Sequence, residues 1–517
     1  MAARGLAAGN RETTPMTLLG LDVNATRARA VSGTMGEFPC PLPLDPPALD
    51  LPMVISLNKP RPEVGQAGVH LVRQMPHLTI QDFLADIGEP PVPGRNWLAK
   101  TPLDSLQALG LVFQRLQPIC SASDGVVLAL PGYLSRSQAD LILSQGTQAR
   151  CPMLGSIPAP VAGALAAYAE QAWYGSALVV DIDDHALTLT AINAVEGNAH
   201  FLETLSLPHL GLRVWKERLL NALADGCVLQ SRRDPRASPM AEQALYEQLD
   251  GILDACRQGR LVQLALQAAN WYQNLVVSPE QPVAYCANLV QYVVQEVEGQ
   301  LSAPWPDGPP NVILLTAAAG RLPGLVQALR LFLEEWKPPL LHGLRTAPTE
   351  DFGEGLFQDG PGGSITVLVL SADAPGRGAH MLAGSIHRGD LASGHLDQAV
   401  PLPLPQPVDA GPARLHFQGE DYFINEASFS LGRQPGCNLV FDGNVYMSVS
   451  PRHCEILFDH RTFMLCDRSR EGTLVNDCPV SSAVVLRPGD WIRLGPDGPL
   501  LRFLGRGPDF SPLLTIA

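Results

Sequence analysis

The chain has 517 residues, 46% of them hydrophobic and 17% charged, so it is globular and too long for a single hydrophobic core. Its formal net charge of -15 argues against general binding to nucleic acid, because an acidic chain gains nothing from counterion release on a phosphate backbone. The ten cysteines form no CxxC pair and no apolar run approaches the roughly 20 residues of a membrane helix, which predicts a soluble, cytoplasmic protein with no zinc ribbon and no membrane insertion.

Strand and helix patterns alternate over most of the chain. Short apolar runs predict strands that are buried on both faces, at Met16–Val23, Gly125–Pro131, Ala177–Asp183 and Asn311–Ala318. Helical patterns lie between them, at Val161–Glu170, Leu212–Leu223, Met240–Arg257 and Val290–Leu301. The alternation predicts a multidomain protein whose first domain, residues 16–397, is α/β and follows a disordered N-terminus at residues 1–15.

The pattern changes at a proline-rich segment, residues 398–412. Its prolines fix φ and lack an N–H, so we expect an extended linker there. Short strands separated by Gly, Pro, Asp and Asn follow over residues 413–506, and they predict an all-β sandwich. Residues 507–517 are left as a C-terminal tail.

Landmarks in the last hundred residues occur in a specific order. They are Gly432-Arg433, then Ser450-Pro451-Arg452-His453, then Gly472-Thr473 with Asn476, and a closing segment Leu486–Gly495. Together they resemble the forkhead-associated (FHA) domain, whose pattern is GR, SxxH, NGT and a following N. The resemblance implies a β-sandwich that binds phosphothreonine-containing proteins.

The residue types fit that chemistry. Arg433 offers a permanently charged planar fork for phosphate oxygens, and Ser450 offers a hydroxyl donor. We expect Arg452, Thr473 and Asn476 to complete the phosphopeptide site. The resemblance gives structural roles to three residues, namely Gly432, His453 and Gly472.

Two residues depart from the family pattern. Glu471 stands where the family has an Asn that contacts the peptide, and a carboxylate there repels phosphate. Pro451 follows the serine and has no N–H to donate. A sandwich used for contacts that do not depend on phosphate therefore stays open as an alternative.

Segments of the first domain resemble the nucleotide-binding domain of DnaK-type heat-shock chaperones. They are Val64–His70, Val126–Asp140, Ile157–Glu170, Ala177–Ile192 and Val312–Leu329. This resemblance implies an actin-like ATPase fold, with two α/β lobes about a cleft. In the chaperones a peptide-binding domain follows, whereas in this chain the FHA-type module stands in its place.

The residues that would bind nucleotide are only partly retained. Asp22, Thr26, Asp181, Gly320 and Arg321 match the family and form a vestigial nucleotide site. Other matching positions have lost the family's residues. A glycine and a threonine are lost across Asn24 and Ala25, and the catalytic carboxylate is lost at Ala159. Glycines are lost at Asp183, Asp184, His185, Ala317 and Ala318. The helix that clamps adenosine maps to Ala255–Arg260, with Arg257 and Arg260 in place of Glu and Lys. Bulk and negative charge in the phosphate hairpins oppose a triphosphate, so we expect a pseudo-ATPase with no catalytic residues.

The leading hypothesis is an adaptor in bacterial Ser/Thr-kinase signalling, in which a pseudo-ATPase scaffold carries a phosphothreonine reader. No cofactor is assigned, although ATP and Mg²⁺ stay open through a nucleotide-dependent chaperone-like switch, with Asp181, Asp183 and Asp184 as cation ligands. A purely structural, oligomerising first domain is a third alternative. The motifs GxSxG, HExxH and GxxxxGK[ST] are absent from the sequence. Three histidines at positions 380, 387 and 395 lack metal-ligand spacing, so we expect them at the surface with no metal bound.

Overall fold

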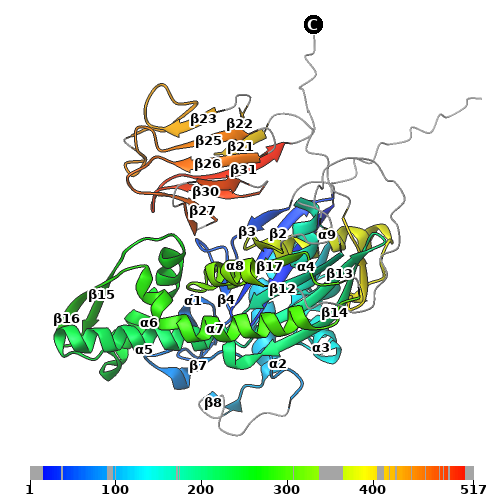
Figure 1. Cartoon of the computed structure of the whole chain (residues 1–517), viewed down its shortest axis with the longest axis horizontal. Coiled ribbons are helices and arrows are strands. Elements are labelled where there is room, and N and C mark those ends of the chain that lie inside the picture. The colour runs from blue at the N-terminus through cyan, green and yellow to red at the C-terminus, as the bar shows by residue number, and fades with distance from the viewer. Residues whose placement is uncertain are drawn as a thin grey trace, which may run out of the picture.

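A computed structural model gives the architecture of the chain (Figure 1). It describes residues 16–35, 39–89, 97–98, 101–170, 173, 175–306, 308–336, 365–403, 413–418, 420–424, 428–443, 445–459, 462–476, 478–480, 483–486 and 489–506. The predicted tails, residues 1–15 and 507–517, and most of the predicted linker lie outside the described residues. Within those ranges, no helix has both the length and the apolar character needed to cross a bilayer.

The first sheet is built around the first predicted strand. β1 (Thr17–Val23) pairs antiparallel with β2 (Arg27–Thr34) and parallel with β10 (Gly125–Leu130). The strand order is β19-β11-β10-β1-β2-β3, and β4 also lies beside β2. The other strands of this sheet are β3 (Cys40–Leu42), β4 (Leu51–Pro52), β11 (Met153–Pro158) and β19 (Gly394–His395).

The second sheet repeats this plan. β12 (Gly175–Ile182) pairs antiparallel with β13 (Leu187–Val195) and parallel with β17 (Val312–Leu315). The order is β18-β17-β12-β13-β14-β20, completed by β14 (Asn198–Leu207), β18 (Thr366–Val369) and β20 (Ala399–Pro401). In each sheet, a hairpin of two antiparallel strands is followed by strands that join it in parallel after a helix. The two halves therefore share one topology.

Helices pack on both sheets. α2 (Ser105–Cys120) and α3 (Arg136–Gln148) contribute to the core of the first sheet. The core of the second sheet receives α5 (Leu212–Ser231), α6 (Pro239–Arg257), α7 (Glu280–Ser302) and α8 (Leu325–Glu335). α4 (Ala159–Glu170) and α9 (Ala374–Arg388) share a third core with strands of both sheets and so join the two halves.

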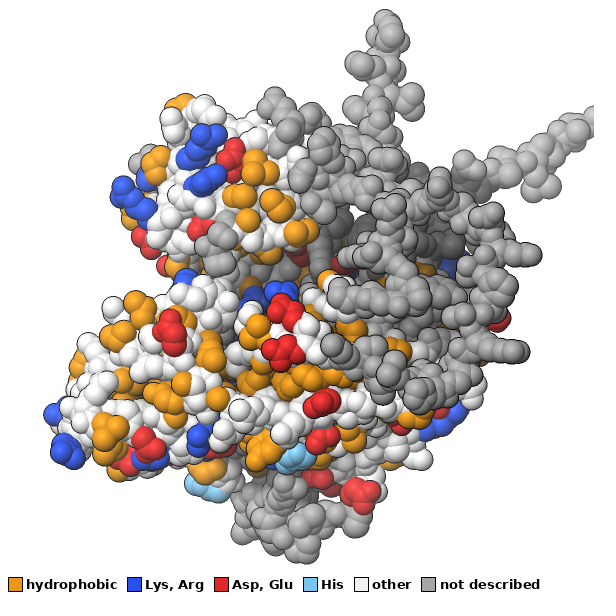
Figure 2. Space-filling view, viewed as in Figure 1, with side chains coloured by type: hydrophobic (Ala, Val, Ile, Leu, Met, Phe, Trp, Pro, Cys, Tyr) orange, Lys and Arg blue, Asp and Glu red, His pale blue; other side chains and the backbone are white. Residues whose placement is uncertain are grey.

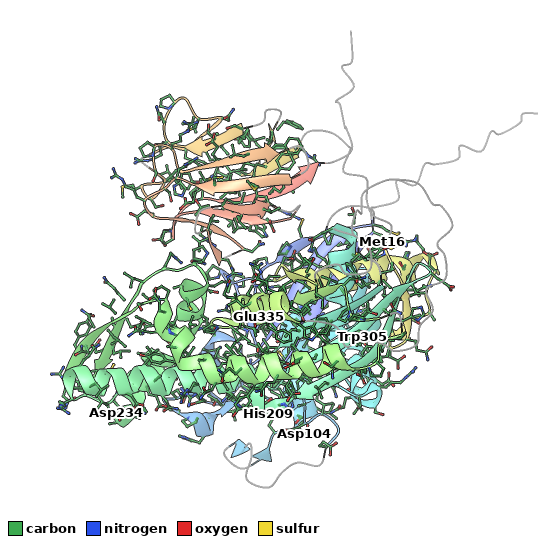
Figure 3. All side chains as sticks on the ribbon, in the orientation of Figure 1. Met16, Asp104, His209, Asp234, Trp305 and Glu335 are labelled. Carbon is green, nitrogen blue, oxygen red and sulfur yellow. The ribbon has the colours of Figure 1, made fainter. Side chains whose placement is uncertain are left out.

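Glycine allows the close packing of α9. A Cβ on Gly378 would overlap the carbonyl oxygen of Ala162 in α4, and a Cβ on Gly20 in β1 would overlap that of Gly376. Smaller elements are α1 (Gln66–Val69), β5 (Ile55–Ser56), β6 (Glu63–Val64), β7 (Thr79–Ile80), β8 (Trp97–Leu98), β9 (Thr101–Pro102), β15 (Val262–Ala268) and β16 (Trp271–Val277). Side chains fill the space between the sheets and the helices of the first domain (Figure 3).

The sandwich at the C-terminus has two sheets and its own core. One sheet has the order β24-β23-β25-β26-β29, with β23 (Ser428–Gly432), β24 (Leu439–Val440), β25 (Cys454–Asp459), β26 (Thr462–Asp467) and β29 (Ala483–Leu486). The other has the order β22-β21-β31-β30-β27-β28, with β21 (Ala413–Phe417), β22 (Glu420–Ile424), β27 (Thr473–Val475), β28 (Cys478–Pro479), β30 (Trp491–Leu494) and β31 (Leu500–Arg506). Buried and half-buried residues alternate along β30, as expected for a strand with one face on a core.

The predicted α/β and all-β regions are confirmed, and three details are wrong. α7 begins ten residues before the predicted helix at Val290. β20 pairs with β14, so the first residues of the predicted linker belong to the second sheet. His380 is buried and not at the surface, because α9 packs against β2, where the ring Nε2 lies 3.2 Å from the carbonyl oxygen of Gly33.

Candidate functional site

Backbone hydrogen bonds bring two of the predicted loops together at one end of the sandwich. The N–H of Arg433, directly after β23, donates to the carbonyl oxygen of Ser450 at 3.2 Å, and the N–H of Gln434 donates to that of Pro451 at 2.8 Å. A Cβ on Gly432 would overlap the Pro451 carbonyl oxygen, so this close approach requires glycine. The loop that bears Arg433 therefore lies directly against the loop that bears Ser450.

The hydroxyl of Ser450 is oriented by a third loop. Its Oγ accepts a hydrogen bond from the N–H of Arg470 at 3.1 Å, and the residue is only 8% exposed. A hydroxyl carries one proton as well as its lone pairs, so the Ser450 proton is left for an incoming acceptor. This arrangement suits a phosphate oxygen approaching from the loop side.

His453 braces the loops from inside, as the sequence predicts. Its Nδ1 accepts from the Ser450 N–H at 2.9 Å, and its Nε2 donates to the Gly472 carbonyl oxygen at 3.2 Å. Because Nδ1 accepts, the proton is on Nε2 and the ring is neutral. Burial lowers the pKa of His453, which keeps the ring in this form.

The guanidinium of Arg433 is exposed at the rim of this end. It packs against Gly443, where a Cβ would lie 3.0 Å from Nη1. Within the described residues no carboxylate pairs with it. Arg452 is also exposed, and its nearest carboxylate, that of Glu455, is 3.7 Å away. Arginines of this outer part of the sandwich appear as blue patches at the upper left of Figure 2.

Two neighbouring arginines were missed by the sequence analysis. Arg468 and Arg470 lie in the loop after β26, and both are exposed. The signal was present as the short basic run Arg468-Ser469-Arg470, in which Arg470 also supplies the N–H that holds Ser450. The positive charges of Arg468 and Arg470 offset the negative charge of Glu471, which is exposed beside them.

Two predicted ligand residues have other roles. Thr473 is fully buried, and its hydroxyl donates to Asp467 Oδ1 at 2.7 Å, so it fixes the loop from within. Asn476 lies beyond the far end of β27, about 10 Å of extended strand away from Thr473. There its side chain donates to Asp490 at 2.7 Å and accepts from the Trp491 N–H at 3.0 Å. Neither residue offers a free side chain to a ligand at the Arg433 end.

We predict that His453→Ala destabilises the sandwich by about 1–3 kcal/mol, because the buried N–H of Ser450 loses its acceptor.

The lowered pKa of His453 also makes the stability of the wild-type sandwich depend on pH. The stabilisation by neutral His453 is complete above pH 6.5 and is lost as the pH falls through the folded-state pKa. Denaturant unfolding of the sandwich at several pH values would measure both effects. An unchanged pH profile in the variant would contradict this role of His453.

In the first domain, the two predicted phosphate hairpins bond to each other. The Asp183 Oδ2 accepts from the N–H of Ala25 at 2.9 Å and from the Tyr133 hydroxyl at 2.7 Å. Its Oδ1 accepts from the N–H groups of His185 and Ala186, both at 3.0 Å. In return, the N–H of Asp184 donates to the Thr26 hydroxyl at 2.9 Å. The turns at Ala25 and Asp183 thus close on each other through a carboxylate.

The acidic residues of this junction resist ionisation. Burial raises the pKa of Asp183 to about 7 and that of Asp22 to about 6. Burial also raises the pKa of Asp181. The cation beside Asp22 is Arg27 of the same hairpin, whose Nη1 lies 3.1 Å from the Asp22 carboxylate. The retained Asp22, Thr26 and Asp181 are therefore engaged within the protein.

The loop that contains Gly320 and Arg321 of the predicted nucleotide site is also engaged within the protein. Arg321 ends a 3₁₀ turn (Ala319–Arg321) and pairs with α6, with its Nε 2.7 Å from Asp254 and its Nη2 3.1 Å from Asp250. A Cβ on Gly320 would lie 2.5 Å from Val369 of β18, so this glycine serves packing. The helix α6 and the loop that contains Arg321 are thus joined by an ion-pair network.

Comparisons with known proteins bear on the C-terminal part. A search of curated proteins found no match to the chain. Residues 429–495 match the model of the FHA domain, and this segment contains Arg433, Ser450 and His453. The sandwich is therefore an FHA domain, which implies that the chain acts as a phosphopeptide-binding adaptor.

Proposed function

We propose that this chain is a phosphothreonine-dependent adaptor of Ser/Thr-kinase signalling, in which the FHA domain reads the phosphorylated partner and the first domain is an actin-like scaffold that binds no nucleotide. The observation that carries the reader function is the exposed Arg433, which pairs with no carboxylate among the residues that the structure describes and lies on the loop directly against that of Ser450. A guanidinium and a hydroxyl together supply both the charge and the directed hydrogen bonds that a phosphate requires. Screening the whole chain against a phosphothreonine peptide library tests the reader function and supplies its ligand.

Topology supports the actin-like assignment. Two sheets that share the order of five strands, each opened by a hairpin and joined by α4 and α9, are expected of a duplicated domain with two phosphate hairpins. The turns at Ala25 and Asp183 occupy the corresponding places in the two halves. This correspondence agrees with the resemblance to DnaK-type chaperones.

Loss of nucleotide binding is supported by the partners of Asp183. In the ATPases that the first domain resembles, hairpin N–H groups hold the phosphates. Here the Ala25 N–H already donates to a carboxylate of the opposite hairpin. A triphosphate would have to displace that carboxylate and then lie beside it, and both steps cost free energy. The same contact weighs against an ATP-dependent switch.

We predict no thermal shift of the first domain with millimolar ATP and Mg²⁺. A ligand at a hundred times its dissociation constant would stabilise the domain by about 2.7 kcal/mol, which a melting curve detects readily. The phosphopeptide selected from the library serves as the positive control, because it should stabilise the FHA domain in the same sample. A clear ATP-dependent shift would overturn the scaffold role and leave the reader role intact.

A further inference from the structure

The end of the FHA domain opposite Arg433 lies against the first domain. The indole Nε1 of Trp491 in β30 donates to the carbonyl oxygen of Pro41 in β3 at 3.1 Å. Next to it, a Cβ on Gly489 would lie 2.9 Å from the carbonyl oxygen of Pro39, so the two backbones are in contact there. In Figure 1, β27 is the part of the sandwich nearest to the rest of the chain.

Cys478, the first residue of β28, is influenced by charged residues of both halves of the first domain. Burial raises the pKa of the Cys478 thiol, and charges that act on it are those of Asp254, Arg257, Arg321 and Arg29. Arg29 comes from β2, whereas the other three come from α6 and the loop after β17. We call these four residues the seam.

The seam is a preorganised charge network. Arg29 forms a two-point ion pair with Asp50, at 2.5 and 2.9 Å. Arg321 joins Asp254 at 2.7 Å, and its charge also lowers the pKa of Asp50. Charged residues of the two halves thus interact with each other near β28. Arg257 lies in the helix that the resemblance assigns to adenosine, and Arg321 belongs to the predicted vestigial nucleotide site.

Asn476 has a role in this contact. It adopts a left-handed conformation, with φ 51°, at the β27–β28 turn. Its two hydrogen bonds, to Asp490 and to the Trp491 N–H, tie the turn to the strand that donates to Pro41. These bonds hold Asn476 beside β30, and we call Asn476, Cys478, Gly489 and Trp491 the docking face.

We propose that this docking face binds the seam, so that the former nucleotide entrance takes the chain's own FHA domain in place of adenosine. This rests on the proposed loss of nucleotide binding. The docked domain holds the Arg433 end away from the first domain, open to a phosphorylated partner. The FHA domain is then carried in a fixed orientation by the scaffold, and the linker does not set its position.

Thiol cross-linking in the full chain tests which end of the FHA domain faces the seam. Arg257→Cys places a thiol on an exposed seam position. Two native cysteines mark the two ends, since Cys478 lies in the docking face and Cys437 in the loop after β23. A short bis-maleimide followed by peptide mass spectrometry then reports the partner of the introduced thiol.

We expect links to Cys478 to exceed links to Cys437 at least about tenfold, because docking fixes a high local concentration at one end only. The unsubstituted chain controls for reaction at the native Cys256, and Arg257→Cys combined with Cys478→Ser should remove the product. Equal linking to both cysteines, or none to Cys478, would overturn the proposal. Neither outcome depends on ATP, so the thermal-shift result on nucleotide binding is judged separately.

Discussion

Arg433→Ala is expected to weaken binding of a phosphothreonine peptide at least about tenfold while the FHA domain stays folded. The side chain is exposed, lies against Gly443 and takes part in no ion pair among the described residues, so we expect its removal to leave the core intact. A charge-assisted hydrogen bond contributes roughly 1.5–3 kcal/mol, which corresponds to about a 10- to 150-fold loss of affinity. Calorimetric titration of the full chain with the phosphopeptide measures the effect.

The matched control is Arg414→Ala. Arg414 lies in β21 of the same domain and its Nη1 lies 3.4 Å from Asp421, so the variant removes the same charge from another place. We expect its affinity to stay close to that of the wild type. Arg433→Lys should recover part of the affinity, because it restores the charge but not the planar fork. Equal affinities of the Arg433→Ala and Arg414→Ala variants would exclude Arg433 as the phosphate ligand.

Asp183→Ala is expected to lower the free energy of unfolding of the first domain by about 3 kcal/mol. The substitution removes the acceptor of four hydrogen bonds, and the N–H groups of Ala25 and Ala186 are buried. Each buried donor left without a partner costs about 1–3 kcal/mol, whereas removal of a buried charge returns part of that cost. Denaturant unfolding followed by tryptophan fluorescence gives the change.

The adjacent residue provides the control for this prediction. The buried Oδ1 of Asp184 has no hydrogen-bond partner among the described residues, and burial raises the pKa of this carboxyl group. Asp184→Ala should therefore cost much less than Asp183→Ala. Asp183→Asn should be intermediate, because one oxygen still accepts while the amide group meets other donors. If the two alanine variants were equally stable, the carboxylate bridge between the hairpins would have no energetic importance.

The central strands could be predicted from the sequence because a strand that is buried on both faces consists almost entirely of apolar residues. Runs such as Gly125–Pro131 are apolar at nearly every position, and the corresponding strand β10 is buried along its whole length. Gly432 and His453 were also predictable, since each has a single structural task within its own motif. The start of α7 was less predictable, because its first turns contain Pro282 and polar residues that do not follow a helical period.

The site itself required the folded chain. Thr473 and Asn476 are three residues apart in one motif, yet Thr473 begins β27 near the Arg433 loops and Asn476 lies beyond its far end. For Asp183, the sequence showed a charge that would repel phosphate. It did not show that this charge accepts a hydrogen bond from Ala25, which is 158 positions away along the chain. Contacts of this kind depend on how the two halves meet, and no local pattern encodes that.

The most direct test of the account compares one peptide in two forms. The full chain is titrated with the selected threonine peptide, phosphorylated and unphosphorylated, in the same buffer. We expect binding of the phosphorylated form alone, because Arg433 and Ser450 offer a cation and a donor that only the phosphate can use. Equal affinity for the two forms would contradict the reader function and identify the FHA domain as a phosphate-independent contact surface.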